Sequence, residues 1–421
     1  MKTRLVLTLC IALLLAAFTA CEKLLEVKNI NNIGESGVSD IKAAAGVVNG
    51  AGGSVARGIA YVMAPYETAT DEVYWIGSRD AWNQLDRGSV SDFNNEFTDQ
   101  AWPFITEGRY MADKAVTLLE GHDAAGLLST SVTISPNRSD LARAYIYSAL
   151  VRIAVGEMFS DFVISDKTDT QPPIGESNLY SLNDQAISAL GKAEIVLNAL
   201  ASSATKTELL RRVYGLRARA AHSKAVRQLM IPAKTTPANP WVQSAQAVAD
   251  ANAALGVMTA DYKWTIDYYT PLLFQELAWE VVGRSELKLE NIPNDPITAA
   301  ADVRMQAGAA DFLDKTKYSD RYSALTMTSA REMHLIIAED YLAKGDATNA
   351  RSRLNTLRAL NSLPQIAATN DINVAMKHER RANTYLQGRR LLDMYRFGVK
   401  DARWVTTSEA YTTPGTLLPV T

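Results

Sequence analysis

Segments with helical periodicity follow one another along most of this chain, and proline-containing stretches separate them. In each segment apolar residues recur every three or four positions, which gives a helix one apolar face. The segments span residues 39–62, 102–120, 140–160, 183–200, 207–230, 241–255, 329–344, 346–360 and 374–397. Breaks fall at Pro136, at Pro172-Pro173 and in "IPAKTTPANP", because proline cannot continue a helix. The sequence therefore predicts a mainly α-helical protein.

The stretch "AEDYLAKGDATNARSRLNTLRAL" indicates how two of these helices pack. Ala338 and Tyr341 come before a turn at Gly345-Asp346. The residues that share one face of the following helix are Ala350, Leu354 and Leu357. Small residues where two helices cross, with larger residues fitted between them, are typical of a tetratricopeptide-like repeat. Weaker versions of this pattern occur at 141–160 with 183–200 and at 216–230 with 241–255.

The helix pairs cover only part of the expected domain, which spans residues 39–421. We expect tetratricopeptide-like repeats over about 102–256 and 329–398. Two irregular segments, about 63–103 and 260–325, have few apolar repeats and are rich in aromatic and polar residues. Long ordered loops on a rigid scaffold often carry function. The expected architecture is a helical-repeat domain whose irregular segments form a ligand-binding face.

The first twenty residues have the features of a secretory signal peptide. Lys2 and Arg4 form a short positive start, and residues 5–17 are apolar but too short to span a bilayer comfortably. Cys21 follows at once, and this arrangement resembles a bacterial lipoprotein signal, in which the cysteine is acylated. We expect a signal peptide over residues 1–20, and the alternative is an ordinary cleaved signal followed by a chance cysteine.

Cys21 is the expected site of a lipid anchor. Two or more acyl chains hold a protein stably on a membrane, whereas a single chain holds it only marginally. Residues 21–38 are polar and lack a helical period, which predicts a tether that leads away from the lipid. The other cysteine, Cys10, lies inside the expected signal, so the domain would depend on a packed core without a disulfide.

The charge balance argues against a nucleic-acid partner. The 421 residues include 43 Lys and Arg and 46 Asp and Glu, which gives a formal net charge of −3. Proteins that bind phosphate backbones need a strongly basic surface. We therefore expect no nucleic-acid binding.

Motifs that would indicate an enzyme are absent from the sequence. There is no H-E-x-x-H and no G-x-S-x-G, and the four histidines are scattered at His122, His222, His334 and His378. Asp71-Glu72 or Glu276 with Glu280 could be a glycosidase pair, but paired carboxylates are common on solvated surfaces. We expect no metal, no cofactor and no catalytic activity.

A basic cluster lies near the carboxyl end, in "HERRANTYLQGRRLLDMYRFG". On a single helix Arg389 and Asp393 are four residues apart and Asp393 and Arg396 three apart, so both pairs share one surface. Glu379 lies several turns earlier on nearly the same side. Because acidic partners are in reach, we interpret the cluster as a structural ion-pair network rather than an anion site. Its expected members are Glu379, Arg380, Arg389, Asp393 and Arg396.

The same stretch resembles the carboxy-terminal signature of the SusD/RagB-like family, in which Glu-Arg, Gly-x-Arg and Asp-x-x-Arg recur at these separations. "REMHLIIAEDYLAKGDATNARSRLNTLR" is similar to the helix pair that precedes this signature in the family, and Asp302-x-Arg304 also fits. The resemblance implies a lipid-anchored, cell-surface protein of the outer membrane that binds a glycan or a peptide. It also implies delivery of that ligand to a TonB-dependent β-barrel transporter, with the helix repeats facing the barrel.

Aromatic residues in the irregular segments are candidate ligand contacts. A sugar ring needs a flat apolar face, and its hydroxyls need polar groups. The first segment offers Tyr66, Tyr74, Trp75, Arg79, Trp82 and Asn83. The second segment offers Trp264, Tyr268 and Tyr269. The alternative is that these residues fill the core beneath a long loop.

Two hypotheses of function follow. The first is a surface nutrient-binding subunit of a TonB-dependent uptake system, and the second is a lipid-anchored helical-repeat scaffold that binds only proteins. A ligand stabilises a protein that binds it as RT ln(1 + [L]/Kd). Thermal stabilisation by small ligands therefore separates the two.

Overall fold

The computed structural model describes residues 35–166, 171–231 and 233–421. The expected signal peptide, the Cys21 anchor and most of the expected tether lie outside these residues. The chain divides into residues 1–43, which hold α2 (Glu35–Val38) and η1 (Ile41–Ala43), and residues 44–421, which hold the remaining elements. Among the described helices, none combines the length and the apolar character needed to cross a bilayer.

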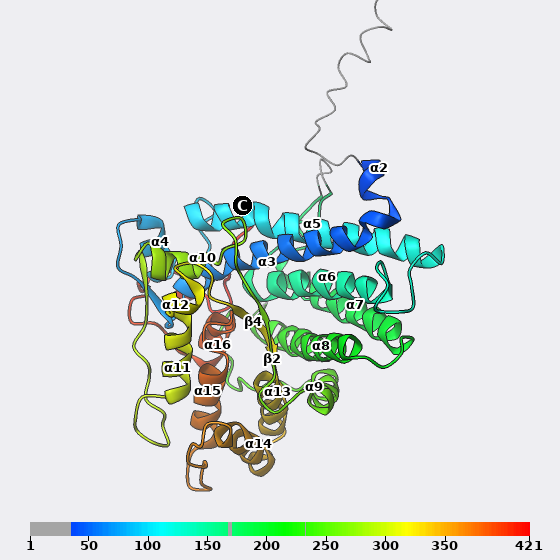
Figure 1. Ribbon diagram of the computed structural model, residues 1–421. Coiled ribbons are helices and arrows are strands. Elements are labelled where there is room, and N and C mark those ends of the chain that lie inside the picture. The colour runs from blue at the N-terminus through cyan, green and yellow to red at the C-terminus, as the bar shows by residue number, and fades with distance from the viewer. Residues whose placement is uncertain (1–34, 167–170, 232) are drawn as a thin grey trace, which may run out of the picture. The chain divides into compact units, whose positions relative to one another are not determined.

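Long helices pack against one another in chain order and form a stack (Figure 1). They are α3 (Ala44–Thr68), α5 (Glu96–Ala124), α6 (Arg138–Met158), α7 (Ser181–Asn198), α8 (Ala204–Met230), α9 (Ala245–Val257), α13 (Ala330–Ala343) and α14 (Ala347–Ala359). Each helix contacts the next, as in a helical-repeat protein. The mainly α-helical, tetratricopeptide-like fold is thereby confirmed.

Short polar side chains begin many of these helices. The side chain of the residue before the first turn accepts a hydrogen bond from a backbone N–H that has no partner within the helix, which contributes about 1 kcal/mol per helix. Helices capped in this way begin after Asn95, Asn137, Ser203, Ser244, Ser329, Asp346 and Asp371. These caps explain why the helices begin within a few residues of the expected positions.

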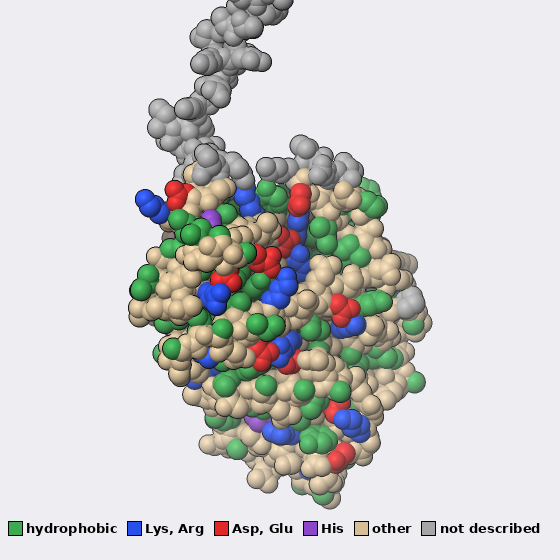
Figure 2. Space-filling view, turned by 90° about the vertical axis from the view of Figure 1, so that its right-hand side faces the viewer, with side chains coloured by type: hydrophobic (Ala, Val, Ile, Leu, Met, Phe, Trp, Pro, Cys, Tyr) green, Lys and Arg blue, Asp and Glu red, His purple; other side chains and the backbone are tan. Residues whose placement is uncertain are grey.

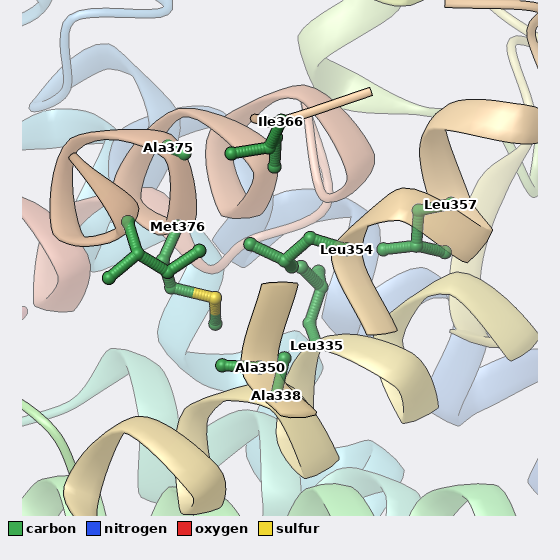
Figure 3. Packing of buried hydrophobic residues seen from close by; sticks show 9 residues of the cluster. Leu335, Ala338, Ala350, Leu354, Leu357, Ile366, Ala375 and Met376 are labelled. Atoms are coloured by element: carbon green, nitrogen blue, oxygen red, sulfur yellow. The ribbon is translucent and has the colours of Figure 1, made fainter. Parts of the chain in front are cut away.

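The helix pair α13 and α14 packs as its sequence predicts (Figure 3). Leu335 and Ala338 of α13 meet Ala350 and Leu354 of α14 in one buried cluster. Met376 of the next helix, α15 (Ile372–Asn383), completes the cluster. Small residues at the crossing allow the two helices to approach closely, and Leu354 and Met376 fill the space beside them.

The expected helix over 374–397 is wrong, because the chain forms two helices there. The first is α15, and the second is α16 (Arg390–Phe397). Between them Leu386 has φ 55° and Gly388 has φ 75°, and neither conformation continues a right-handed helix. A Cβ atom at Gly388 would overlap Met158, so glycine there also allows the turn to pack against α6.

The irregular segments are shorter than expected and contain regular elements. In the first, α3 runs on to Thr68 and α5 already begins at Glu96 because Asn95 caps it. Two antiparallel strand pairs form, β1 (Val73–Trp75) with β3 (Leu287–Leu289) and β2 (Lys263–Ile266) with β4 (Leu325–Ser329). The first strand pair joins the two irregular segments to each other.

Short helices complete the irregular segments and occupy the left side of Figure 1 with α15 and α16. They are α4 (Asp80–Asp86), α10 (Glu276–Ala278), η3 (Trp279–Gly283), α11 (Val303–Phe312) and α12 (Lys315–Tyr318). The short helix α17 (Glu409–Thr412) lies in the carboxy-terminal tail.

The face shown in Figure 2 carries charges of both signs. Basic and acidic side chains lie next to one another on it, with hydrophobic side chains between them. Ion pairs along the helix stack follow the same pattern, as with Arg152 and Asp113 at 2.7 Å and Arg217 and Glu194 at 2.6 Å. Such a mixed surface differs from the continuous basic surface of a protein that binds phosphate backbones.

Candidate functional site

A pocket of about 380 Å³ opens where the two irregular segments meet. The residues that give it its character are Tyr61, Arg79, Glu96, Phe274, Glu276 and Trp279. They come from α3, from the start of α4, from the first turn of α5 and from the stretch around α10 and η3. Three of its nine lining residues are aromatic and six are polar or charged, so it is a concave, mostly polar site with an aromatic side. We name it the α10 pocket.

Aromatic rings form one side of the α10 pocket. The ring of Tyr61 lies 4.2 Å from that of Phe104 and meets Phe274 edge-on at 5.7 Å, measured between ring centroids. The guanidinium of Arg321 lies 4.0 Å from the ring centroid of Trp279. All three lining rings, Tyr61, Phe274 and Trp279, are partly exposed, so their faces and edges remain accessible to a ligand.

Local packing fixes Trp279 and Arg79 beside the pocket. A Cβ atom at Gly283 would overlap the ring of Trp279, so glycine at this position leaves room for the ring. On the opposite segment, Glu286 accepts hydrogen bonds from the backbone N–H groups of Ser78 (2.8 Å) and Arg79 (3.0 Å). Because Glu286 adjoins β3, this carboxylate ties the Arg79 backbone to the second irregular segment.

Two pairs of opposite charge lie in or beside the pocket. The Arg79 guanidinium forms an ion pair with Glu96 and lies 4.5 Å from the ring centroid of Phe97. Arg284 lies 3.7 Å from the carboxylate of Glu280. The polar lining is completed by Asp99 and Gln100 of α5. Such a lining offers hydrogen-bond donors and acceptors without a large net charge.

Glu276 is a buried carboxyl group in this pocket. Burial raises its pKa to about 7, and the nearby carboxylate of Glu280 adds to the rise. Its Oε2 atom is buried and has no hydrogen-bond partner among the described residues. Below neutral pH Glu276 is therefore protonated and can donate a hydrogen bond.

We expect the protein to lose stability as the pH rises from about 5 to about 7. In that range an unfolded Glu276, with its ordinary pKa of about 4.5, has released its proton, whereas the folded protein still holds it. Glu276→Gln should reduce the loss by up to about 3 kcal/mol, measured by urea unfolding at pH 5 and pH 7. Burial also raises the pKa of Glu67 to about 7. Glu67 should therefore preserve part of the pH dependence of stability in Glu276→Gln.

The control for this prediction is Glu107→Gln, which removes a largely exposed carboxylate on α5 that pairs with Arg57. This variant should keep the pH dependence of the wild-type protein. If Glu276→Gln and Glu107→Gln had the same pH dependence as the wild type, Glu276 would not titrate as the structure indicates.

The structure places the sequence-predicted residues of the first segment at different depths. Arg79 lines the pocket, as expected. Trp82 is fully buried, stacks on Phe97 with ring centroids 3.4 Å apart, and donates from Nε1 to Glu280 (3.1 Å). In this geometry the ring of Trp82 has no surface for a ligand, and it belongs to the core beside the pocket. Tyr66 is fully buried too, and its hydroxyl accepts from the backbone of Leu392 (3.4 Å).

The candidates of the second segment also differ in exposure. Trp264 and Tyr268 are buried. The guanidinium of Arg212 lies 4.7 Å from the ring centroid of Trp264, and the Tyr268 hydroxyl donates to the carbonyl of Ala56 (3.0 Å). These contacts agree with the alternative that Trp264 and Tyr268 fill the core beneath a long loop. Tyr269, by contrast, is 71% exposed.

Tyr74, Trp75 and Asn83 lie outside the lining of the α10 pocket. Tyr74 and Trp75 are neighbours on β1, so their side chains point to opposite faces of the strand, and both are partly exposed. The Asn83 amide donates to Asp80 (3.0 Å) on α4. A ligand contact of these three residues stays a prediction.

Seven pocket residues were not among the sequence candidates, namely Tyr61, Glu96, Asp99, Gln100, Phe274, Trp279 and Arg284. Phe274 and Trp279 lie in a segment that is rich in aromatic residues, and this enrichment was the available signal. Tyr61 lies inside α3, where its spacing resembles that of a core residue. Only the tertiary arrangement brings it to the pocket.

Asp393 and Glu339 are the acidic centres of a buried ion-pair network. Asp393 accepts hydrogen bonds from Arg380 (2.6 Å) and Arg396 (2.8 Å). Glu339 pairs with Arg396 as well, and His222 Nε2 lies 3.0 Å from its Oε2 atom. Burial alone would raise the pKa of Asp393, but the charges of Arg380 and Arg396 hold it below its ordinary value.

Two members of the expected network have other partners than predicted. Arg389 pairs with Glu332 of α13 (3.0 Å) and not with Asp393. Glu379 pairs with Arg358 (2.7 Å) and Arg304, and not with the Asp393 cluster. The reason is the break between α15 and α16, which removes the common helical face that the prediction assumed.

The fold and the pocket together define a helical-repeat protein whose irregular segments form a pocket. No protein-family model matches the sequence, and no curated protein matches it. Solved structures do match. A SusD homolog from Bacteroides thetaiotaomicron has a TM-score of 0.60 at 14% identity, over 94% of this chain and 96% of that chain.

Two further solved structures are similar. A SusD-like carbohydrate binding protein from Bacteroides vulgatus has a TM-score of 0.56 at 13% identity, over 85% of this chain and 83% of that one. Surface glycan-binding protein A from Bacteroides uniformis has a TM-score of 0.50 at 13% identity, over 86% and 91%. This chain has the SusD-like fold, which confirms the fold that the sequence resemblance implied.

Proposed function

We propose that the protein is a non-catalytic, cell-surface glycan-binding protein that holds an oligosaccharide in the α10 pocket. The observation that carries this proposal is the SusD-like fold over nearly the whole chain. Two of the similar structures are named a carbohydrate binding protein and a glycan-binding protein. A peptide is the alternative ligand.

The chemistry of the α10 pocket supports a neutral sugar. Tyr61, Phe274 and Trp279 offer apolar surfaces for the C–H faces of a sugar ring. Gln100 and the paired charges around Arg79 offer donors and acceptors for hydroxyl groups. Two arginines and three acidic residues line the pocket, so its net charge is small and does not favour a strongly ionic ligand.

The carboxylates near the pocket support binding rather than hydrolysis. A glycosidase needs two carboxyl groups that both reach the scissile bond. Glu280 is fully buried and accepts a hydrogen bond from Trp82, so it cannot reach a bound sugar in this geometry. Glu96 and Asp99 line the pocket with Glu276, and Glu96 is already paired with Arg79.

Delivery of the ligand to a TonB-dependent outer-membrane transporter is part of the proposal. The sequence resemblance to the SusD/RagB-like family supports this partner. The lipoprotein-type signal supports a lipid on Cys21 that keeps the protein on the outer membrane. A protein anchored in this way beside the transporter would hold the glycan close to the barrel until it is transported.

Extraction of the native protein from its outer membrane with a gentle detergent tests the partner and the anchor. We expect a large β-barrel protein to co-purify with the wild-type chain. Cys21→Ala should be recovered without membranes and with at most a small fraction of the barrel, because the attached lipid no longer raises the local concentration.

The two outcomes separate the two hypotheses of function. Recovery of a β-barrel with the anchored protein would support the role in uptake. Anchored protein that is recovered without a barrel would favour the helical-repeat scaffold that binds only other proteins. Membrane-bound Cys21→Ala would contradict the lipid anchor.

A further inference from the structure

A second hollow lies away from the α10 pocket. It is a groove of about 750 Å³ between the β2–β4 strand pair, the helices α11 and α12, and the turn that joins α15 to α16. The residues that line it are different from those that line the α10 pocket. Its volume lies in the range of small-molecule sites. We name it the α11 groove.

Small residues line much of the α11 groove. Ala307 and Gly308 come from α11, Ala324 from the stretch before β4, and Ala382 from α15. Their side chains are too small to fill the groove, whereas larger side chains at these positions would narrow it. A Cβ atom at Gly308 would lie 3.4 Å from the ring of Tyr385, so the groove is close-packed on that side. A flat ring fits such a site better than a branched apolar side chain does.

Polar groups with compensated charge form one end of the groove. Arg331 donates two hydrogen bonds to Asp261, at 2.5 and 2.9 Å. It also donates to the side-chain oxygens of Asn361 (2.9 Å) and Asn383 (3.1 Å). The side chain of Asp261 is 59% exposed, so its carboxylate can accept further hydrogen bonds.

A second compensated pair lies on the α11–α12 side of the groove. Asp311 accepts from the Lys317 ammonium (2.7 Å) and from the Tyr318 hydroxyl (3.3 Å). Fixed carboxylates and amides of this kind can bind the hydroxyl groups of a ligand. Because Asp261 and Asp311 already have cationic partners, a neutral ligand suits the groove better than a polyanion or a polycation.

The turn between α15 and α16 forms a third wall and holds an unusual conformation. Leu386 has φ 55°, a left-handed conformation that is rare for a leucine. Two buried carboxylates hold the turn, since Glu72 accepts from the N–H of Leu386 (2.8 Å) and Glu67 from that of Gly388 (2.6 Å). Strained backbone that the surrounding structure fixes in this way is concentrated at ligand sites.

The same turn carries polar atoms with unused hydrogen-bonding capacity. The hydroxyl of Tyr385, a side chain that is 9% exposed, and the Oε1 atom of Gln387 are buried, and neither has a hydrogen-bond partner among the described residues. Both residues line the groove. Buried polar atoms without a partner are rare in folded proteins and call for an explanation. A ligand hydroxyl that meets a rotated Gln387 amide would use this capacity.

We propose that the α11 groove is a second binding site, which takes a neutral polyhydroxylated ligand such as one or two units of a saccharide. The small-residue lining accommodates a sugar ring, and the Asp261 and Asp311 clusters accept its hydroxyl groups. The proposal goes beyond glycan binding at the α10 pocket, and it rests on different residues, so the two can fail separately.

A variant that fills the groove tests the proposal. Ala307 is exposed in the middle of α11, so Ala307→Trp places a ring in the groove without opening the core. The matched control is Ala310→Trp, an exposed position on the same helix that does not line the groove. Both are combined with Trp279→Ala, which weakens the α10 pocket. Binding of neutral mono- and disaccharides to full-length protein in detergent is followed by saturation-transfer NMR.

We expect Trp279→Ala to retain saccharide binding that Ala307→Trp weakens at least tenfold, while Ala310→Trp leaves it unchanged. Equal residual binding with Ala307→Trp and with Ala310→Trp would overturn the groove site and leave the α10 pocket untouched. Complete loss of binding in Trp279→Ala alone would also overturn it. Neutral tripeptides could instead bind where saccharides do not, with binding that Ala307→Trp weakens. That result would overturn the ligand class. If no saccharide binds the wild-type protein, both the groove and the proposed function fail.

Discussion

Replacement of Asp393 by alanine lowers the free energy of unfolding by about 3–5 kcal/mol, because it leaves two buried guanidinium groups with a single carboxylate partner. Arg380 and Arg396 both donate to this carboxylate, and Arg396 is fully buried. Glu339 remains as a partner of Arg396 and, at 3.6 Å, of Arg380, but one carboxylate cannot compensate both guanidinium groups. Urea unfolding followed by circular dichroism measures the change. The affinity of the folded fraction for a ligand should stay the same.

A surface ion pair gives the control for this experiment. Asp184 pairs with Lys224 at 2.7 Å, and both side chains are partly exposed. Asp184→Ala should cost less than about 1 kcal/mol, because solvent screens the pair. An Asp393→Ala protein of full stability that no longer bound ligand would contradict the structural role and would move the binding site to the ion-pair network.

Replacement of Trp279 by alanine lowers the affinity for the cognate oligosaccharide on the order of tenfold to a hundredfold. Trp279 is partly exposed and offers the largest aromatic surface in the lining of the α10 pocket. Loss of the ring removes the apolar contact with a sugar ring and opens the pocket to water. Isothermal titration calorimetry of the purified protein measures the change in Kd.

Trp241→Ala is the matched control for this variant. Trp241 is also partly exposed, but it lies before α9 and donates to Asn373 of α15 (3.0 Å), outside the pocket lining. Its replacement should leave the Kd unchanged. Equal losses of affinity in both variants would indicate a general loss of stability, and an unchanged Kd in Trp279→Ala would place the oligosaccharide elsewhere.

The sequence predicts the helix stack well because the signals for it are local. Ala350 and Leu354 are spaced for one helical face, and they meet Ala338 of the preceding helix in the core as expected. Polar caps such as Asn95 and Asp346 define where helices begin. A helical repeat consists of neighbouring pairs in the chain, so short-range patterns determine most of its architecture.

The turn between α15 and α16 could not be predicted in the same way. Residues 374–397 have a helical period throughout, and leucine is a residue that favours helices. The left-handed conformation of Leu386 depends on Glu72, which accepts from its N–H and lies far away in the sequence. The ion-pair partners of Glu379 could not be predicted for the same reason, since Arg304 and Arg358 come from other elements.

The aromatic residues that line the pocket could not be predicted from single segments. An aromatic residue in an irregular segment can face the core, as Trp82 does, or line a pocket, as Trp279 does. The amino-acid type is the same in both cases, and only the packing of the two irregular segments separates them. Arg79 was identified as a polar neighbour of the aromatic residues in the first irregular segment, whereas Tyr61 inside α3 carried no such signal.

The most direct test of the proposed function is the melting temperature of the wild-type protein, measured with each member of a panel of neutral oligosaccharides and short peptides. A saccharide at a hundred times its Kd should stabilise the protein by about 2.7 kcal/mol and raise the melting temperature by several degrees. We predict such a shift for at least one oligosaccharide, and a smaller shift at the same concentration in Trp279→Ala. Stabilisation by peptides alone, or by no member of a panel that includes the glycans the cells grow on, would contradict a glycan-binding protein.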